Sequence, residues 1–248
     1  MADRLGQIVA FGGGGFSMEP GNSLLDDYVV GVTGRERPRV CFVPTASGDA
    51  DHYVVRFYRA FGAGRCEPSH VSLFRRDRGA GAVEGDLAAH LLGQDLIYVG
   101  GGSVISMLGA WRAHGLHEVL AAAWGAGTVL CGLSAGSLCW FAEAVTAFHG
   151  SPQRVEGLGL LPWSNCVHYD GEPSRRREYL RFVGDGMGPG YAADDGAALR
   201  FVGTELAEVV CSRPGKGAHR VEVRDGEVVE QRIEGRYLGA APVVLAAA

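Results

Sequence analysis

The sequence predicts an α/β fold with a mostly parallel sheet, helices on both faces and antiparallel hairpins toward the C-terminus. Short apolar runs without alternation are separated by longer helix-like segments, and glycine-rich turns follow three of these runs. Unalternated apolar runs are typical of parallel strands buried on both faces. With 248 residues, 47% of them hydrophobic, the chain suits one large domain over residues 1–248.

The first two thirds of the chain alternate predicted strands with predicted helices. We expect strands at Gln7–Phe11, Arg39–Pro44, Leu96–Val99 and Thr128–Leu130, and helices at Asp51–Phe61, Gly85–Leu92 and Ser103–His114. Because such a sheet gathers its loops at the C-terminal ends of the strands, we expect the functional site at that edge.

The last third has a different pattern. Four segments alternate or form short apolar runs split by glycine-rich turns, which is typical of antiparallel hairpins added to the sheet: 197–202, 207–210, 219–223 and 227–230. Residues 241–248 are expected to form a last strand or a tail.

Charge and composition indicate a small-molecule or peptide partner. The formal net charge is −5 and the one dense basic run is Arg175–Arg177, so a nucleic-acid-binding surface is not expected. Lys216 is the only lysine and lies in a glycine-rich loop, which argues against Schiff-base chemistry or a Ser-Lys dyad. The turn Gly12–Gly15 lacks the G-x-G-x-x-G spacing of a dinucleotide loop.

Cysteine usage and hydropathy favour a reducing cytoplasm. The six cysteines are scattered without C-x-x-C spacing, which argues for buried free thiols and against a metal site. The first residues show no long apolar run after a basic start, and no stretch reaches about 18 apolar residues, so neither a secretory leader nor membrane association is expected. We expect no cofactor.

Cys131–Ser137 contains the most informative motif, Gly-Leu-Ser-Ala-Gly, between the apolar run Thr128–Leu130 and a helix expected through Ala142. A serine on such a strand-turn-helix elbow has its hydroxyl exposed at the sheet edge, so Ser134 is the candidate nucleophile. The alternative is that Ser134 only caps the helix.

A nucleophilic serine needs a base and an orienting acid. His168 ends the apolar run Asn165–Val167 and would face the same crevice as Ser134, with His149 and His219 as competitors. The acid could come from the pair Asp194–Asp195 or from two carboxylates close to the histidine, Asp170 and Glu172.

Taken together, four motifs resemble peptidase family S51, which contains dipeptidase E and, more distantly, cyanophycinase. They are Tyr98–Ser103, Gly132–Ser137, Val167–Asp170 with the residues that follow, and Asp194–Leu199. In this order and spacing they cover roughly residues 7 to 202. The resemblance implies a flavodoxin-like sheet related to class I glutamine amidotransferases, with a serine in place of their cysteine.

The resemblance implies Ser134 as nucleophile, His168 as base and Asp194 or Asp195 as acid. Asp195 aligns better because it directly precedes the Gly-Ala-Ala-Leu segment, although family members commonly have a glutamate there. The oxyanion hole would be formed by the Ala135 N–H with that of Gly101 or Gly102.

On the substrate side, dipeptidase E commonly has an asparagine where this chain has Ser103. An arginine after the catalytic histidine is thought to bind the N-terminal aspartate of the substrate. Arg175, Arg176 and Arg177 occupy that neighbourhood, and a guanidinium can bind a carboxylate through two parallel N–H groups. The alternative is a solvated helix start.

We therefore expect a cytoplasmic serine peptidase, monomer or homodimer, that hydrolyses small peptides, with Asp-X dipeptides as the first candidates, through an acyl-enzyme. One alternative is an α/β-hydrolase-type esterase with the triad Ser134, Asp195 and His219. Another is a non-catalytic amidotransferase-like binding domain.

Overall fold

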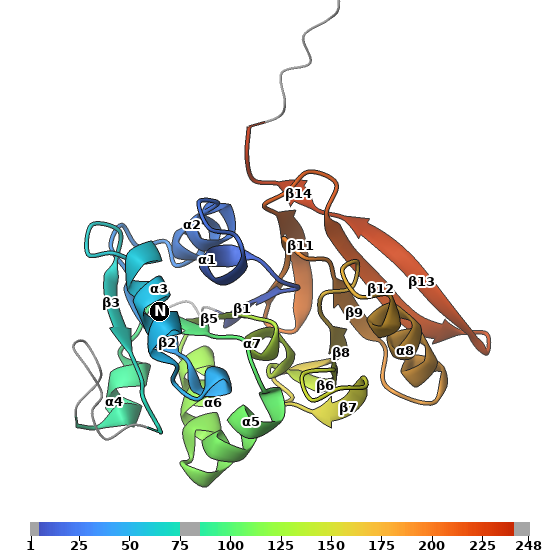
Figure 1. Cartoon of the computed structure of the whole chain (residues 1–248), viewed down its shortest axis with the longest axis horizontal. Helices are drawn as coiled ribbons and strands as arrows, with labels where there is room; N and C mark the ends of the chain where they lie inside the picture. Colours follow the sequence, from blue (N-terminus) through green and yellow to red (C-terminus); the bar gives the residue numbers. More distant parts are fainter. Residues whose placement is uncertain (1–4, 75–84, 241–248) are drawn as a thin grey trace, which may run out of the picture.

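The computed structural model describes residues 5–74 and 85–240, which fold around two β-sheets (Figure 1). The described residues form a first sheet of eight strands in the order β14-β11-β10-β1-β5-β4-β2-β3. Its strands are β1 Gln7–Phe11, β2 Arg39–Val43, β3 Glu67–His70, β4 Leu96–Val99, β5 Val129–Leu133, β10 Ala197–Val202, β11 Glu205–Cys211 and β14 Arg236–Tyr237.

Five neighbouring strands of this sheet, β1, β5, β4, β2 and β3, are parallel. The stretch β3-β2-β4-β5 has the 2-1-3-4 strand order of a flavodoxin-like sheet, with β1 beside β5. The hairpin β10–β11 continues the sheet in antiparallel fashion from β1. The predicted α/β class, with its largely parallel sheet, is confirmed.

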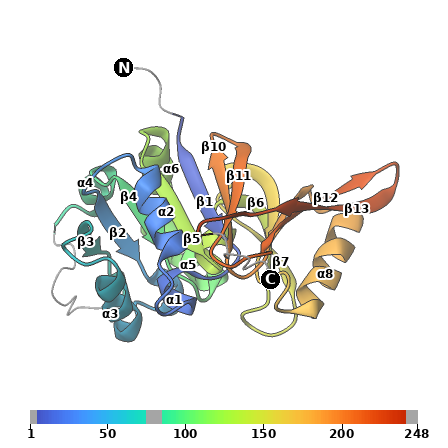
Figure 2. The same cartoon turned by 90° about the horizontal axis from the view of Figure 1, so that it is seen from above.

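Helices cover both faces of the first sheet (Figure 2). They are α1 Gly15–Met18, α2 Leu24–Val32, a 3₁₀ turn η1 Thr45–Ser47, α3 Asp51–Ala60, α4 Leu87–Leu92, α5 Val104–Ala113 and α6 Leu116–Gly125. Alternate strand residues enter two cores: Ile8 and Ile97 contact the α4–α6 side, and Val9 and Tyr98 the α1–α3 side. Burial on both faces explains the continuous apolar runs.

The described residues form a second sheet of six strands in the order β13-β12-β9-β8-β6-β7. They are β6 Phe141–Thr146, β7 Gln153–Glu156, β8 Leu161–Cys166, β9 Gly190–Ala193, β12 Gly217–Arg224 and β13 Glu227–Glu234, and α8 Pro173–Gly184 packs on β12 and β13. We had placed the β12–β13 hairpin on the first sheet, and this was wrong. β12 pairs instead with β9.

The helix expected after Ser134 is also shorter than predicted. Helix α7, Ala135–Leu138, makes a single turn, and β6 already begins at Phe141. Phe141 pairs with Leu161 and is fully buried, so pairing and burial in the second sheet outweigh helix formation by this apolar stretch. Residues 241–248, considered as a last strand or tail, lie outside the described residues. In the described chain no helix is long and apolar enough to span a bilayer.

Candidate active site

Ser134 lies on a tight turn between β5 and α7, at the C-terminal edge of the first sheet. Its backbone angles, φ 51° and ψ −114°, are unusual for a residue with a side chain and are typical of a strained nucleophile elbow. A Cβ on Gly136 would lie 2.2 Å from the Val99 carbonyl oxygen, and one on Gly132 would lie 2.4 Å from the Gly136 oxygen. The two glycines of the motif therefore allow α7 to approach β4 and β5.

A continuous hydrogen-bonded chain connects Ser134 to a histidine and a carboxylate. His168 Nε2 lies 3.1 Å from Ser134 Oγ, and His168 Nδ1 lies 2.6 Å from Asp195 Oδ1. With Nδ1–H donating to the carboxylate, Nε2 is free to accept the serine proton. The side chains of His168 and Asp195 are 14% and 23% exposed, so the chain is accessible from one side.

The three residues come from both sheets. Ser134 follows β5 of the first sheet, whereas His168 and Asp195 follow β8 and β9, parallel neighbours in the second. The glycine turn after β1 joins the two parts: Gly12 O accepts a hydrogen bond from His168 N–H at 3.0 Å, and Gly13 O accepts one from Gly196 N–H at 2.9 Å. The first glycine cluster of the sequence therefore holds the backbone at His168 and next to Asp195.

The structure distinguishes the candidate acids. Asp194 is buried and accepts a hydrogen bond from Gly217 N–H at 3.1 Å, and burial together with the nearby Asp170 charge raises its pKa. Asp170 accepts a bond from Asp195 N–H at 2.8 Å and pairs with Lys216. Although burial opposes it, the lysine lowers the pKa of Asp170. Asp195 is the carboxylate that contacts His168.

The competing histidines have other neighbours. His149 Nε2 lies 2.8 Å from Ser103 Oγ. The His219 ring packs against Tyr169 with 5.0 Å between ring centroids, and burial lowers the pKa of His219. Of these three histidines, His168 is the one within hydrogen-bond distance of Ser134, and not His219, which the esterase alternative requires.

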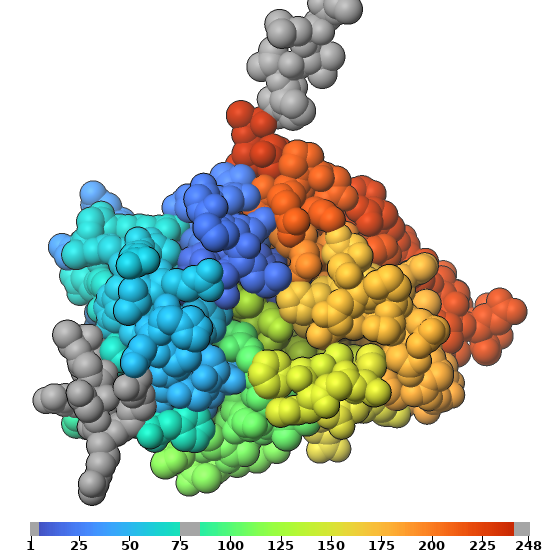
Figure 3. Space-filling view, viewed as in Figure 1, coloured from blue at the N-terminus to red at the C-terminus, as the bar shows by residue number. Residues whose placement is uncertain are grey.

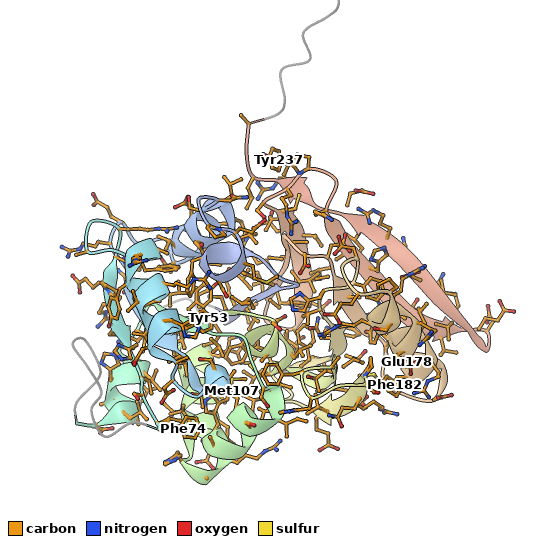
Figure 4. All side chains as sticks on the ribbon, viewed as in Figure 1. Tyr53, Phe74, Met107, Glu178, Phe182 and Tyr237 are labelled. Atoms are coloured by element: carbon orange, nitrogen blue, oxygen red, sulfur yellow. The ribbon has the colours of Figure 1, made fainter. Side chains whose placement is uncertain are left out.

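Tyr53 on α3 is a residue that the sequence analysis missed. Its hydroxyl accepts a hydrogen bond from Gly101 N–H at 3.0 Å, and burial raises its pKa. A Cβ on Gly101 would lie 3.4 Å from that of Ser134, so Tyr53 accepts a hydrogen bond from a candidate oxyanion donor beside Ser134. Figure 4 labels Tyr53 on α3. The Ala135 N–H belongs to the first residue of α7, directly after the serine.

The residues expected on the substrate side have partners within the chain. Ser103 caps α5 by accepting a bond from Ser106 N–H at 3.2 Å, besides contacting His149. Arg175 is buried and pairs with Glu172 at 2.6 Å. Two arginines extend further into solvent: Arg176, which pairs with Glu230, and Arg177, which is 77% exposed and lies 3.4 Å from Glu178.

Figure 3 shows a hollow near the centre of this face of the molecule. Its floor has the green colour of the segment that includes the glycine turn after β4 and the serine elbow, and its rim has the blue of the N-terminal third on one side and the yellow of the β6–β8 region on the other. Within the described ranges no cluster of three or more His, Cys, Asp or Glu residues is arranged to hold a metal.

Comparison with known proteins finds peptidases among the relatives of this chain. An uncharacterized peptidase, YgaJ of Bacillus subtilis, is 46% identical over 234 residues, which is 94% of this chain and 99% of the relative. Peptidase E of Streptomyces coelicolor is 30% identical over 200 residues, 75% of this chain and 78% of the relative.

The fold is also that of a solved peptidase. The crystal structure of a peptidase from an acI-B1 actinobacterium superposes with a TM-score of 0.69 at 18% identity, covering 95% of this chain and 96% of the other. The sequence model of peptidase family S51 matches residues 8–209, a span that includes Ser134, His168 and Asp195. The chain therefore belongs to peptidase family S51.

Proposed function

We propose that this peptidase is of the serine type and hydrolyses small peptides with Ser134 as nucleophile, His168 as base and Asp195 as orienting acid. The observation that carries the proposal is the hydrogen-bonded chain of 3.1 Å and 2.6 Å that begins at a serine on a strained elbow. Nucleophile, base and orienting group within hydrogen-bond reach of one another are the signature of nucleophilic catalysis.

In the proposed reaction, His168 Nε2 accepts the Ser134 proton while Oγ bonds to the scissile carbonyl carbon. The tetrahedral oxyanion would accept hydrogen bonds from Ala135 N–H and from Gly101 or Gly102. His168 then donates its proton to the leaving amine, the C–N bond breaks and an acyl-enzyme remains. Water attacks the ester with His168 again as base, which releases the acid and restores the serine.

For the substrate we propose dipeptides with an N-terminal aspartate, read by Arg175. Of the three arginines after His168, Arg175 has the least exposed side chain, at 9%, and it lies closest in sequence to the histidine. A guanidinium removed from water discriminates strongly for a carboxylate, because loss of the anion leaves it without a partner. Glu172 now holds this guanidinium, so the substrate carboxylate would compete with it.

Single and double substitutions test the nucleophile and the base. Ser134→Ala and His168→Ala are each expected to lower kcat for dipeptide hydrolysis at least about a thousandfold, and the double variant to be barely worse, because the two act as a unit. A fluorophosphonate should label the wild type and not the Ser134→Ala variant.

Two matched controls keep the result specific. Ser151→Ala removes an exposed serine before β7, and His219→Ala removes a histidine next to Tyr169. Both should retain wild-type kcat. Retention of more than a few per cent of kcat by Ser134→Ala would place the nucleophile elsewhere, and severe loss in His219→Ala would favour the esterase alternative.

The specificity is tested with Asp-Leu, Asn-Leu and Ala-Leu. The proposal expects Asp-Leu to be preferred, and Arg175→Met to remove the preference while leaving acylation of Ser134 by a small activated ester intact. Equal kcat/KM for the three peptides would reject the aspartyl assignment and leave the serine mechanism standing.

A further inference from the structure

A cavity of about 470 Å³ opens between the α1–α2 segment and α3, and none of Ser134, His168 and Asp195 lines it. The α1–α2 segment contributes Phe16, Asn22 and Asp26 to its lining. Helix α3 and the residues after it contribute three arginines, Arg56, Arg59 and Arg65. Figures 1 and 2 both place α1 next to α3. The volume lies within the range of small-molecule sites, which is about 300 to 1,000 Å³.

Positive charge in this cavity is only partly compensated. Arg56 and Arg59 lie three residues apart on α3, so their side chains project from the same face of the helix. Among the described residues neither arginine forms an ion pair. Arg65, by contrast, pairs with Asp27 at 2.6 Å and lies over the Phe61 ring.

The carboxylates that line the cavity do not neutralise the two free arginines. Glu19 is held by Arg213 at 2.9 Å and by the Ser212 hydroxyl at 2.6 Å. Asp26 is 1% exposed, and burial raises its pKa to about 7, so the carboxyl group is substantially protonated near neutral pH. Two arginines without an ion-pair partner among the described residues therefore line the cavity.

We propose that this cavity is a binding site for a small anion that carries a carboxylate or phosphate group, separate from the peptide-hydrolysing site. Arg56 and Arg59 would bind the anionic oxygens, since the guanidinium fork matches the geometry of both groups. The Phe16 ring, in the aromatic cluster with Tyr53 and Phe57, provides an apolar wall for the remainder of the ligand.

The site is connected to the catalytic turn through α3. Arg56 lies one helical turn after Tyr53, whose hydroxyl holds Gly101 N–H. Phe16 follows the glycine turn in which Gly13 lies against Asp195 and His168. A ligand at Arg56 thus contacts the helix that positions Tyr53, although binding itself does not depend on peptide hydrolysis.

Calorimetric titration of the full chain with inorganic phosphate, and separately with succinate, tests the proposal at fixed ionic strength. We expect saturable one-to-one binding of at least one probe with a Kd below about 10 mM. Binding of phosphate alone would identify a phosphate-bearing ligand, and binding of succinate alone a carboxylate. The Arg56→Gln/Arg59→Gln double variant should bind at least about tenfold more weakly.

The matched control is Arg112→Gln, which removes an exposed arginine from α5, outside the cavity lining. This variant has one positive charge less than the wild type but should bind the probe with wild-type affinity. The single variant Arg59→Gln makes the same change of charge inside the cavity, so the two variants separate a local contact from an effect of net charge. Because α3 exposes both arginines and glutamine is a good helix former, the variants should stay folded. Absence of binding by both probes, or equal binding by the wild type and the double variant, would overturn the proposal.

Discussion

Gly13→Ala tests whether the rate depends on the exact placement of Asp195 against His168. A Cβ on Gly13 would lie 2.0 Å from Asp195 Oδ1 and 2.9 Å from His168 Nδ1, where ordinary contacts are at least 3.4 Å. The carboxylate oxygen must therefore move by about 1.4 Å, and the 2.6 Å hydrogen bond to the histidine is lost. Misplacement by 1 Å can cost about 10²-fold and loss of the orienting acid about 10⁴-fold. We expect kcat/KM to fall within that range.

The assay is steady-state hydrolysis of a dipeptide together with the rate of fluorophosphonate labelling, which should fall in parallel because acylation also needs the base. Thermal unfolding checks that the variant folds. Gly31→Ala on α2 is the matched control, since a Cβ there meets nothing within 4 Å. A folded Gly13→Ala variant with kcat/KM within threefold of wild type would refute the reasoning.

Three substitutions test a backbone hydrogen bond, an ion pair and a buried carboxyl group. Tyr53→Phe removes the acceptor of Gly101 N–H and should lower the free energy of unfolding by about 1 kcal/mol. The kcat should stay within about threefold of wild type, because the N–H becomes available to the substrate oxygen. A fall of kcat beyond thirtyfold in steady-state assays would contradict this. Glu172→Gln releases Arg175 and should raise the ratio of kcat/KM for Asp-Leu over Ala-Leu several-fold, whereas an unchanged ratio would mean that Arg175 does not contact the substrate. Asp26 has a pKa of about 7 in the fold against 3.8 for a free carboxyl, so its contribution to stability is full below about pH 4 and is lost as the pH rises through 7, by about 4 kcal/mol in all. The free energy of unfolding, measured with urea, should therefore fall less between pH 5 and pH 8 in Asp26→Asn than in the wild type. An equal fall in both proteins would exclude Asp26 as its origin.

The first sheet could be predicted because its strands are buried on both faces. Leu96–Val99 is fully buried along its whole length, so its apolar run carries the signal without alternation. The strands of the second sheet could not be recognised from such apolar runs. The stretch from Leu138 to Ala142 is apolar throughout and suits a helix or a strand, and only its pairing with Leu161 decides.

The candidate site also has one part that a local motif predicts and another that depends on the whole fold. The elbow around Ser134 is a local motif, because its glycines are required by contacts within β4, β5 and α7. Which histidine meets the serine depends on how the ends of β8 and β5 face each other across two sheets, and this is a property of the whole fold. Tyr53 lies 48 residues before Gly101 with no motif to connect them, so no sequence signal could have identified it.

Aspartate at position 195 is one methylene shorter than the glutamate expected from the family, and the surrounding structure explains how it reaches the histidine. Gly13 and Gly171 flank the carboxylate so closely that a Cβ on either would lie within 3 Å of one of its oxygens. From the other side, Asp170 accepts the Asp195 N–H at 2.8 Å and is itself paired with Lys216. Lys216, the only lysine of the chain, thus anchors the loop that carries Asp195, and the glycine turn after β1 provides the space that this carboxylate needs to contact His168.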